Sequence, residues 1–333
     1  MYNKQGNTSG EETQPLVSFI VTYHNQPLAM LCECINSILQ LLLQSSEREI
    51  IVIDDGSLEI PTSVLKQYGN DITYVRQSNS GVSVARNTAL YMARGTFIQI
   101  IDADDALIKS PYEHCINIIR NTNDIDMLIF DFSNSPTTSA KDYKETPLTT
   151  GSHYLRHNNI RGSICCCLFR QSIRGKLEFS PGIAYGEDEE FTPQLLVRAE
   201  SVCATDAKAY FYRQHNSSAV HQTDDASTQK RLEDTFKVIL NLNNIADTLP
   251  KNDCLAIKRR VAQLTMDHIY NTIMLTNSQT ILNQQIELLR QKGLFPLPYR
   301  NYSTKYKWFR RLTSSSLGRS TLLHILPLLK KER

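Results

Sequence analysis

Apolar runs alternate with helix-like stretches along the first hundred residues of the chain. Runs at 15–22, 49–53, 72–76 and 96–101 are short and rich in β-branched residues, which is typical of buried strands. Between them, apolar residues recur at helical spacing, most clearly at 28–42. Strands that alternate with helices in this way predict an α/β fold with a doubly wound, mostly parallel sheet.

The pattern changes in the second half of the chain. Strand-like runs recur at 126–132, 163–169 and 202–212, and a polar stretch at 133–150 is predicted to be an exposed loop. From residue 226 the apolar positions follow a helical period. The sequence therefore predicts an α/β domain that is followed by a helical appendage.

These changes divide the chain into three parts. Residues 1–14 are polar, with no apolar core and no basic start, so they are predicted to be a disordered lead-in and not a signal peptide. Residues 15–225 form the predicted α/β domain, and residues 226–333 form the predicted helical region. No apolar run approaches the roughly 18 residues that a membrane-spanning helix needs.

Carboxylates crowd the end of the fourth predicted strand. Asp102, Asp104 and Asp105 lie within four positions, and a polar stretch also ends each of two earlier strands. Parallel strands end at one edge of a sheet, which is where ligands bind in open α/β folds. Such carboxylates suit a hard cation whose remaining coordination positions are filled by substrate phosphates. The alternative is that Asp104 or Asp105 caps a helix that opens at Leu107.

Composition narrows the function only a little. The chain is 41% hydrophobic and 21% charged, as is usual for a folded soluble protein. Its eight cysteines include no CxxC pair and no zinc spacing, which favours free thiols in a reducing cytoplasm. The chain contains neither GxGxxG nor GxxxxGK[ST], so neither a dinucleotide site nor a P-loop is indicated.

Six blocks carry a resemblance to a known family. They are VSFIVTYHN at 17–25, EIIVIDDGS at 49–57, NSGVSVARNTAL at 79–90, GTFIQIIDADD at 95–105, YGEDEEF at 185–191 and YFYRQHNSS at 210–218. In this order and spacing they resemble the family 2 glycosyltransferases, which are inverting enzymes with a Rossmann-like GT-A fold. One departure is Thr22, where the family usually has proline.

The resemblance implies that residues 15–112 bind a nucleotide-diphosphate sugar and that residues 113–225 bind the acceptor. The sugar would pass to an acceptor hydroxyl with inversion, assisted by Mn²⁺ or Mg²⁺ as Lewis acid. By resemblance, Asp104 is the direct metal ligand, and Asp102 contacts the ribose or an ordered water. Asp105 is either a supporting contact or the helix cap.

The resemblance also assigns the nucleotide pocket. Asp55 matches the residue that accepts the imide N–H of uracil, so a UDP-sugar is the favoured donor. Thr22, Tyr23 and Asn25 would line the same pocket, with the Tyr23 ring stacking on the base. Arg86 lies where the family contacts the nucleotide, and its alternative is a surface cation. Asp54, beside Asp55, could have a structural role instead of binding the nucleotide.

Inversion in one displacement needs a general base for the acceptor hydroxyl. Asp188 matches that base in relatives, and the alternative is that it only caps the following helix. Glu187 would contact acceptor or donor sugar, whereas its neighbours at 189 and 190 are interpreted as structural acids of a first helical turn. In relatives with the YRxH pattern the Arg contacts the diphosphate and the His the metal, so the resemblance implies these roles for Arg213 and His215.

The C-terminal tail differs in charge from the rest of the chain. Residues 300–333 carry nine Lys or Arg and one Glu, a net charge of +8, whereas the remainder carries −6. Aromatic residues at 299–309 and an apolar run at 322–329 accompany this charge. We expect a cytoplasmic protein with peripheral attachment to an anionic membrane surface, where lipid-linked saccharide acceptors are made. The alternative is a tail that closes the core, and the family context argues against nucleic acid.

Two other functions compete with glycosyl transfer. A sugar nucleotidyltransferase would need a Gly-rich, cationic loop after the first strand, and the loop at 23–27 contains neither a glycine nor a Lys or Arg. A non-catalytic nucleotide-sugar-binding protein would not need Asp102, Asp104 and Asp188 together. The sequence therefore favours transfer onto a saccharide acceptor, in polysaccharide or glycoconjugate assembly.

Overall fold

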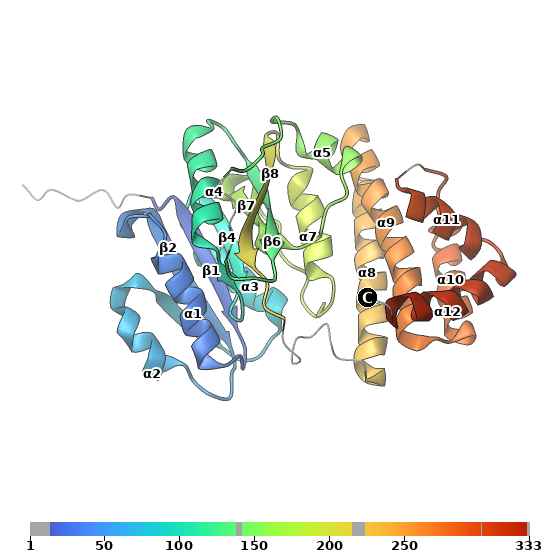
Figure 1. The fold of residues 1–333 in the computed structure, drawn as a ribbon, viewed down its shortest axis with the longest axis horizontal. Helices are drawn as coiled ribbons and strands as arrows, with labels where there is room; N and C mark the ends of the chain where they lie inside the picture. The colour runs from blue at the N-terminus through green and yellow to red at the C-terminus, as the bar shows by residue number, and fades with distance from the viewer. Residues whose placement is uncertain (1–13, 138–141, 215–223, 301, 332–333) are drawn as a thin grey trace, which may run out of the picture.

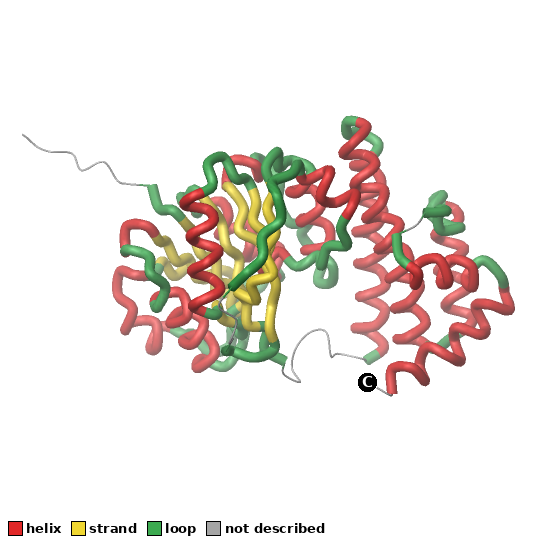
Figure 2. Tube along the Cα trace, turned by 45° about the horizontal axis from the view of Figure 1, so that its top comes forward, coloured by secondary structure: helices red, strands yellow, loops and turns green. Residues whose placement is uncertain are grey.

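The computed structural model describes residues 14–137, 142–214, 224–300 and 302–331. A mixed sheet with flanking helices forms the left part of the molecule in Figure 1, and the C-terminal helices stand to its right. Figure 2 shows the same division, with all of the drawn strands gathered in the first part. The predicted lead-in lies outside the described residues, apart from Gln14.

Eight strands make up the sheet, in the order β3-β2-β1-β4-β7-β6-β8-β5. Pairing is parallel among the first four and between β6 and β8, whereas β7 and β5 run against their neighbours. The α/β prediction is confirmed, with a sheet that is parallel in its first half and mixed in its second. The strands are β1 Val17–Tyr23, β2 Arg48–Asp55, β3 Thr73–Gln77, β4 Phe97–Asp102, β5 Ala106–Leu107, β6 Met127–Ser133, β7 Cys167–Arg170 and β8 Val202–Phe211.

Helices cover the sheet because its central strands are apolar on both faces. All seven residues of β1 are buried, as the unbroken apolar run predicts for a strand inside a parallel sheet. Helices α1 and α4 lie in front of the sheet in Figure 1. The α-helices of this part are α1 Leu28–Leu39, α2 Thr62–Leu65, α3 Val82–Met92, α4 Lys109–Asn121, α5 Gly151–His157, α6 Gln171–Arg174 and α7 Glu187–Leu196.

The C-terminal region is helical, as predicted. Helix α8 packs on α7, and α9 packs on α5 and α7, so this region is joined to the sheet-containing part. Asp224, Ser278 and Ser303 cap three of the helices through their side-chain oxygens. None of the helices in the described ranges has the length and apolar character needed to cross a membrane. The helices are α8 Asp225–Ala246, α9 Lys251–Thr276, α10 Gln279–Gln291, α11 Thr304–Thr313 and α12 Ser316–Lys331.

The parallel register brings the predicted polar ends together. Thr22 at the end of β1 pairs with Asp102 on β4, and Tyr23 pairs with Asp54 on β2. The carboxyl ends of β1, β2 and β4 therefore lie at one edge of the sheet. The alternation of strands and helices predicted this meeting point correctly.

Two local predictions are wrong. The predicted strand at 163–169 begins only at Cys167, because Ile164–Cys166 form a 3₁₀ turn whose Cys165 carbonyl accepts the Gln99 side-chain amide at 2.8 Å. The alternative in which a helix opens at Leu107 is also wrong, because residues 106–107 pair with β8 as strand β5 and the helix begins at Lys109. Neither Asp104 nor Asp105 therefore caps that helix.

Candidate functional site

Asp105 anchors the turn that follows β4. Its carboxylate is 2% exposed and accepts the Tyr210 hydroxyl at 2.7 Å and the Arg213 backbone N–H at 2.8 Å. The same Tyr210 hydroxyl accepts the Asp102 backbone N–H at 3.2 Å. Burial, together with the charge of Asp102, raises the pKa of Asp105 to about 8. Of the two roles considered for Asp105, these contacts agree with a residue that supports the carboxylate turn and not with a helix cap.

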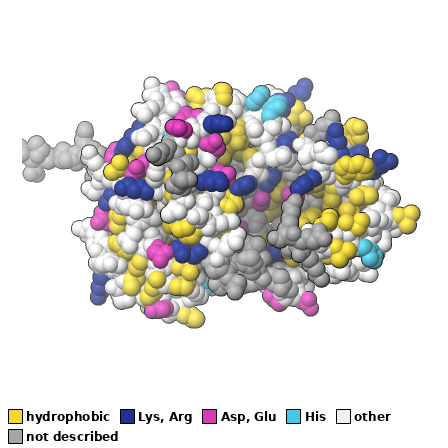
Figure 3. Space-filling model, in the orientation of Figure 1, with side chains coloured by type: hydrophobic (Ala, Val, Ile, Leu, Met, Phe, Trp, Pro, Cys, Tyr) yellow, Lys and Arg dark blue, Asp and Glu magenta, His cyan; other side chains and the backbone are white. Residues whose placement is uncertain are grey.

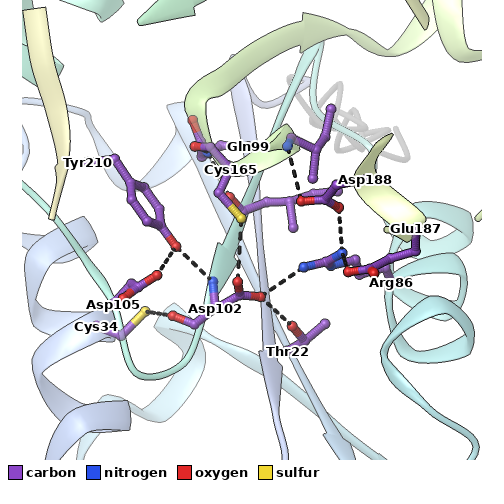
Figure 4. Close-up of polar contacts among 12 residues, drawn as sticks. Thr22, Cys34, Arg86, Gln99, Asp102, Asp105, Cys165, Glu187, Asp188 and Tyr210 are labelled. Carbon is purple, nitrogen blue, oxygen red and sulfur yellow. Dashed lines mark hydrogen bonds and ion pairs between the residues drawn. The ribbon is translucent and has the colours of Figure 1, made fainter. Parts of the chain in front are cut away.

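Arg86 lies at the centre of three carboxylates (Figure 4). Its guanidinium is 2% exposed and contacts Asp102 at 3.0 Å, Glu187 at 2.9 Å and Asp188 at 2.7 Å. Burial lowers its pKa, but the three carboxylates outweigh burial and hold the pKa well above its ordinary value. Arg86 is therefore a buried cation that joins helices α3 and α7 to strand β4, and not a surface cation.

Asp188 lies in the first turn of α7. The helix N-cap is Gly186, whose φ of 90° is a left-handed conformation that suits glycine, so capping does not explain Asp188. One Asp188 oxygen contacts Arg86, and the other accepts the Ile164 backbone N–H at 3.2 Å. Burial raises the pKa of Asp188 to about 7, against the opposing charge of Arg86. A carboxylate with a near-neutral pKa suits proton transfer at neutral pH.

The two acids that follow are structural, as predicted. Glu189 forms an ion pair with Arg260 of α9. Glu190 accepts the Ser180 hydroxyl at 2.9 Å and the Asn241 side-chain amide at 3.1 Å. Both acids therefore tie α7 to its neighbours and contribute no carboxylate to the cluster around Arg86.

Asp55 holds the loop that leads into α3. It accepts the Gln77 side-chain amide at 2.8 Å and the backbone N–H groups of Ser80 at 2.9 Å and Gly81 at 2.8 Å. A carboxylate offers about four acceptor positions, so one remains for a ligand N–H. Asp54 is fully buried and accepts the Ser57 N–H at 2.8 Å, which supports its structural alternative.

The loop after β1 meets the predictions only in part. The Thr22 hydroxyl donates to Asp102 at 3.4 Å, so Thr22 does lie at the carboxylates. Tyr23 is 1% exposed and packs in the core, so the predicted stacking of its ring on a base is wrong for this structure. The exposed Asn25 accepts the Leu58 N–H at 2.7 Å and thereby braces the neighbouring loop.

The predicted metal and diphosphate ligands lie beside this cluster. The Asp104 side chain is partly exposed, and the Asp104 carbonyl accepts the Arg213 Nε–H at 2.8 Å. The Arg213 guanidinium also pairs with Glu33 on α1 at 2.5 Å. His215 lies outside the described residues. In the described ranges no three His, Cys, Asp or Glu side chains form a metal cluster, but a cation held by one carboxylate and two phosphates needs no such cluster.

Comparison with known families settles the class of this protein. A model of the family described as Glycosyl transferase family 2 matches residues 18–177. Residues 18–177 therefore form a family 2 glycosyltransferase domain. The matched range contains the second, third and fourth sequence blocks and nearly all of the first, whereas the blocks at 185–191 and 210–218 lie beyond it.

Curated relatives match the chain in part. The uncharacterized glycosyltransferase EpsJ of Bacillus subtilis is 28% identical over 220 residues, which is 61% of this chain and 62% of EpsJ. The minor teichoic acid biosynthesis protein GgaB of the same organism is 26% identical over 230 residues, which is 63% of this chain and 24% of GgaB. The chain thus spans less than two thirds of either relative.

Solved structures confirm the GT-A fold. S. aureus TarS in complex with UDP-GlcNAc superposes with a TM-score of 0.67 at 17% identity, covering 95% of this chain and 91% of that one. The mannosyltransferase PcManGT of Pyrobaculum calidifontis, in complex with GDP-Man and Mn²⁺, gives a TM-score of 0.57 at 13% identity, with 96% and 88% covered. At such identities the likeness concerns the fold alone.

The structure adds residues that the sequence did not single out. Tyr210 links Asp105 to the Asp102 backbone, and the Cys165 thiol donates to the Asp102 carboxylate at 3.6 Å. Tyr210 stands inside the YFYRQHNSS block, so its position was a usable signal. Cys165 lies in a run of three cysteines with no spacing that indicates a role, and no signal in this sequence would have found it.

Proposed function

We propose that the protein is an inverting glycosyltransferase that moves a sugar from a UDP-sugar to an acceptor hydroxyl in glycan biosynthesis. The observation that carries this proposal is the contact of one buried guanidinium with Asp102, Glu187 and Asp188 at once. Through it, a carboxylate at the donor end of β4 and a candidate base at the start of α7 lie within reach of one cation. That arrangement suits a reaction in which donor and acceptor meet between the two.

The proposed chemistry is a single displacement. The acceptor hydroxyl oxygen bonds to the anomeric carbon, the bond from that carbon to the diphosphate oxygen breaks, and the hydroxyl proton passes to the Asp188 carboxylate. The pKa of Asp188, raised by burial to about 7, supports this role as base. Arg86 orients the carboxylate and opposes its protonation. Mn²⁺ or Mg²⁺ held by Asp104 would supply the charge that the departing diphosphate needs.

We propose a uridine donor because the Asp55 carboxylate can still accept one more hydrogen bond. That carboxylate is fixed by three donors, and its fourth position suits the imide N–H of uracil. TarS is described with UDP-GlcNAc and PcManGT with GDP-Man, so both pyrimidine and purine donors belong in the test. We expect UDP to bind more tightly than GDP, and Asp55→Asn to remove that preference.

The test measures nucleotide release. Protein with Mn²⁺ is incubated with UDP-GlcNAc, UDP-glucose, UDP-galactose or GDP-mannose, with a mixture of saccharide acceptors, and free UDP or GDP is quantified. UDP release is expected, and both Asp104→Ala and Asp188→Asn should abolish it, whereas the exposed Glu178→Gln should leave it unchanged. Pyrophosphate release from UTP and a sugar phosphate would instead identify a nucleotidyltransferase. Tight UDP binding without turnover would identify a non-catalytic protein.

The C-terminal helices support a further proposal, peripheral attachment to an anionic membrane surface. Tyr306 and Leu322 are buried, so the tail packs on the neighbouring helices, but Trp308, Leu317 and Leu328 are 60%, 84% and 63% exposed. Figure 3 shows hydrophobic and basic side chains next to one another over this part of the molecule. Exposed aromatic and apolar side chains among Lys and Arg suit a lipid surface.

Vesicle flotation tests the attachment. Wild type is expected to float with phosphatidylglycerol vesicles more than with phosphatidylcholine vesicles. The double variant Trp308→Glu, Leu328→Glu should stay in the soluble fraction, whereas the exposed Tyr91→Glu on α3 serves as the matched control. Equal flotation of wild type and the double variant would refute the attachment without bearing on the transferase proposal.

A further inference from the structure

A cavity of about 260 Å³ lies beside the cluster around Arg86, and none of the four residues of that cluster lines it. Residues of β6, β8 and α7 line it, together with α5 and the loop and turn that lead from α5 into β7. The lining combines charged, amide, hydroxyl and aromatic side chains, a mixture suited to a small polar ligand. Six of the residues that line it are Asp131, Tyr154, Asn159, Arg161, Thr192 and Asp206.

The cavity adjoins the candidate base. Ser163 and Cys166 line it, and Ile164, which lies between them in the chain, donates its backbone N–H to Asp188 at 3.2 Å. Thr192 follows Asp188 by four positions on α7, so both side chains lie on one side of that helix. A ligand in the cavity would therefore lie within about one helical turn of the Asp188 carboxylate.

One wall of the cavity is fixed by two arginines from α9. Arg259 is 8% exposed and donates to the Leu155 carbonyl at 2.9 Å and to the Asn159 side-chain oxygen at 2.7 Å. Arg260 is 5% exposed and donates to the Ile160 carbonyl at 3.2 Å. The wall is thus held in place before any ligand arrives, which reduces the cost of ordering it on binding.

The polar groups of the cavity favour an uncharged ligand. Arg161 pairs with Asp131 at 2.7 Å, and its guanidinium lies 4.5 Å from the centre of the Phe132 ring. Sugar hydroxyls both donate and accept hydrogen bonds, so they suit a carboxylate and a guanidinium that stand side by side. Asp206 adds a second lining carboxylate, whereas Arg259 and Arg260 bring guanidiniums to the wall and Glu189 pairs with Arg260, so these charges balance. A cavity without excess charge suits an uncharged ligand better than an anionic one.

We propose that this cavity is a subsite for an uncharged sugar residue of the acceptor, bound through Asp131 and Arg161. The inference rests on the proposed transferase function and deepens it. It assigns the acceptor's chemical class next to the reacting hydroxyl, a neutral saccharide and not a phosphate or a sugar acid.

Ligand-observed NMR tests the subsite on the full chain with UDP and Mn²⁺ present. The neutral probes are the methyl glycosides of glucose, galactose and N-acetylglucosamine, and the anionic probes are glucuronic acid and glycerol phosphate. Saturation transfer is expected to at least one neutral probe and to be at least fivefold weaker to both anionic ones. Asp131→Ala and Arg161→Ala should each reduce the neutral signal at least fivefold, whereas Arg156→Ala on α5 should not change it.

The experiments distinguish failure of the transferase proposal from failure of the subsite proposal. A wild-type protein that fails to bind UDP in calorimetry would refute the transferase proposal. A protein that binds UDP but gives no signal with any neutral probe would refute the subsite alone. Equal signals from anionic and neutral probes, or signals that survive both Asp131→Ala and Arg161→Ala, would also overturn it. Both positions are partly exposed, so these variants are expected to fold, and thermal denaturation checks that they do.

Discussion

Replacing Arg86 with methionine removes the one cation that, within the described part of the chain, contacts Asp102, Glu187 and Asp188 together. The Arg86 and Asp188 side chains are 3% and 18% exposed, so water screens their attraction only in part. Two unit charges about 4 Å apart attract by about 4 kcal/mol at an effective dielectric constant of about 20, which is roughly a thousandfold in a protonation equilibrium. Arg86→Met should therefore strengthen proton binding to Asp188 by about 10²- to 10³-fold.

The effect on the rate follows from the fraction of wild-type molecules in which Asp188 is ionised. Its pKa of about 7 leaves roughly half of the wild-type molecules with an ionised base at pH 7. A base acts as the carboxylate, so activity is lost as pH falls through its pKa, and a higher pKa moves that loss to higher pH. We expect UDP release by Arg86→Met to fall about 10²- to 10³-fold at pH 7 and to recover as pH rises above 8.

The assay is a pH–rate profile of UDP release between pH 5 and pH 10. Arg76→Met is the matched control, because Arg76 pairs with the buried Asp54 at 3.2 Å near the same sheet edge and forms no ion pair with Asp188. Its acid limb should coincide with that of wild type. If folded Arg86→Met loses activity equally at every pH, the electrostatic reasoning is wrong and Arg86 acts through geometry or donor binding instead.

Three further predictions concern the metal, the carboxylate turn and a close backbone contact. Chelation with EDTA should abolish UDP release and Mn²⁺ should restore it; release that is insensitive to EDTA would contradict a metal at Asp104. Tyr210→Phe should lower the free energy of unfolding by about 1–3 kcal/mol in urea titration, because it removes one of the two donors to the buried Asp105 carboxylate and the acceptor of the Asp102 N–H. Gly151→Ala would place a Cβ 1.8 Å from the Leu196 carbonyl oxygen, so its melting temperature should fall by at least 4 °C, whereas an unchanged value would refute the contact.

The sheet and the meeting of its polar ends could be predicted from local pattern. Apolar runs fix the strands, and parallel pairing follows from the helices between them, so Thr22 and Asp102 had to end near one another. The partners of Arg86 could not be predicted in the same way. It meets Asp188 across 102 positions of chain, and only the placement of α7 on the folded sheet decides that contact.

Asp105 shows how distant pairing overrides a local signal. An aspartate before an apolar helical stretch is typical of an N-cap. However, the two residues that follow Asp105 pair with β8, so the helix begins only at Lys109. The Asp105 carboxylate instead accepts a hydrogen bond from Tyr210 of β8. In the tail, by contrast, the local pattern does hold for Tyr306, which is buried as the helical spacing of apolar residues predicts. The exposure of Trp308 is not explained by packing within the chain.

The charge arrangement around Arg86 would link donor binding to the proposed base, Asp188. The negative charge of Asp102 is one of the causes that raise the pKa of Asp188, and both carboxylates share the same guanidinium. A donor ribose that takes the Asp102 carboxylate would leave Arg86 more fully to Asp188 and would lower the pKa of the base. The acid limb of kcat, which reports the complex, should therefore lie at lower pH than that of kcat/KM, which reports the free enzyme. On this reasoning the base becomes competent when the donor is in place, so a carboxylate buried at some cost in stability serves to order the two binding events.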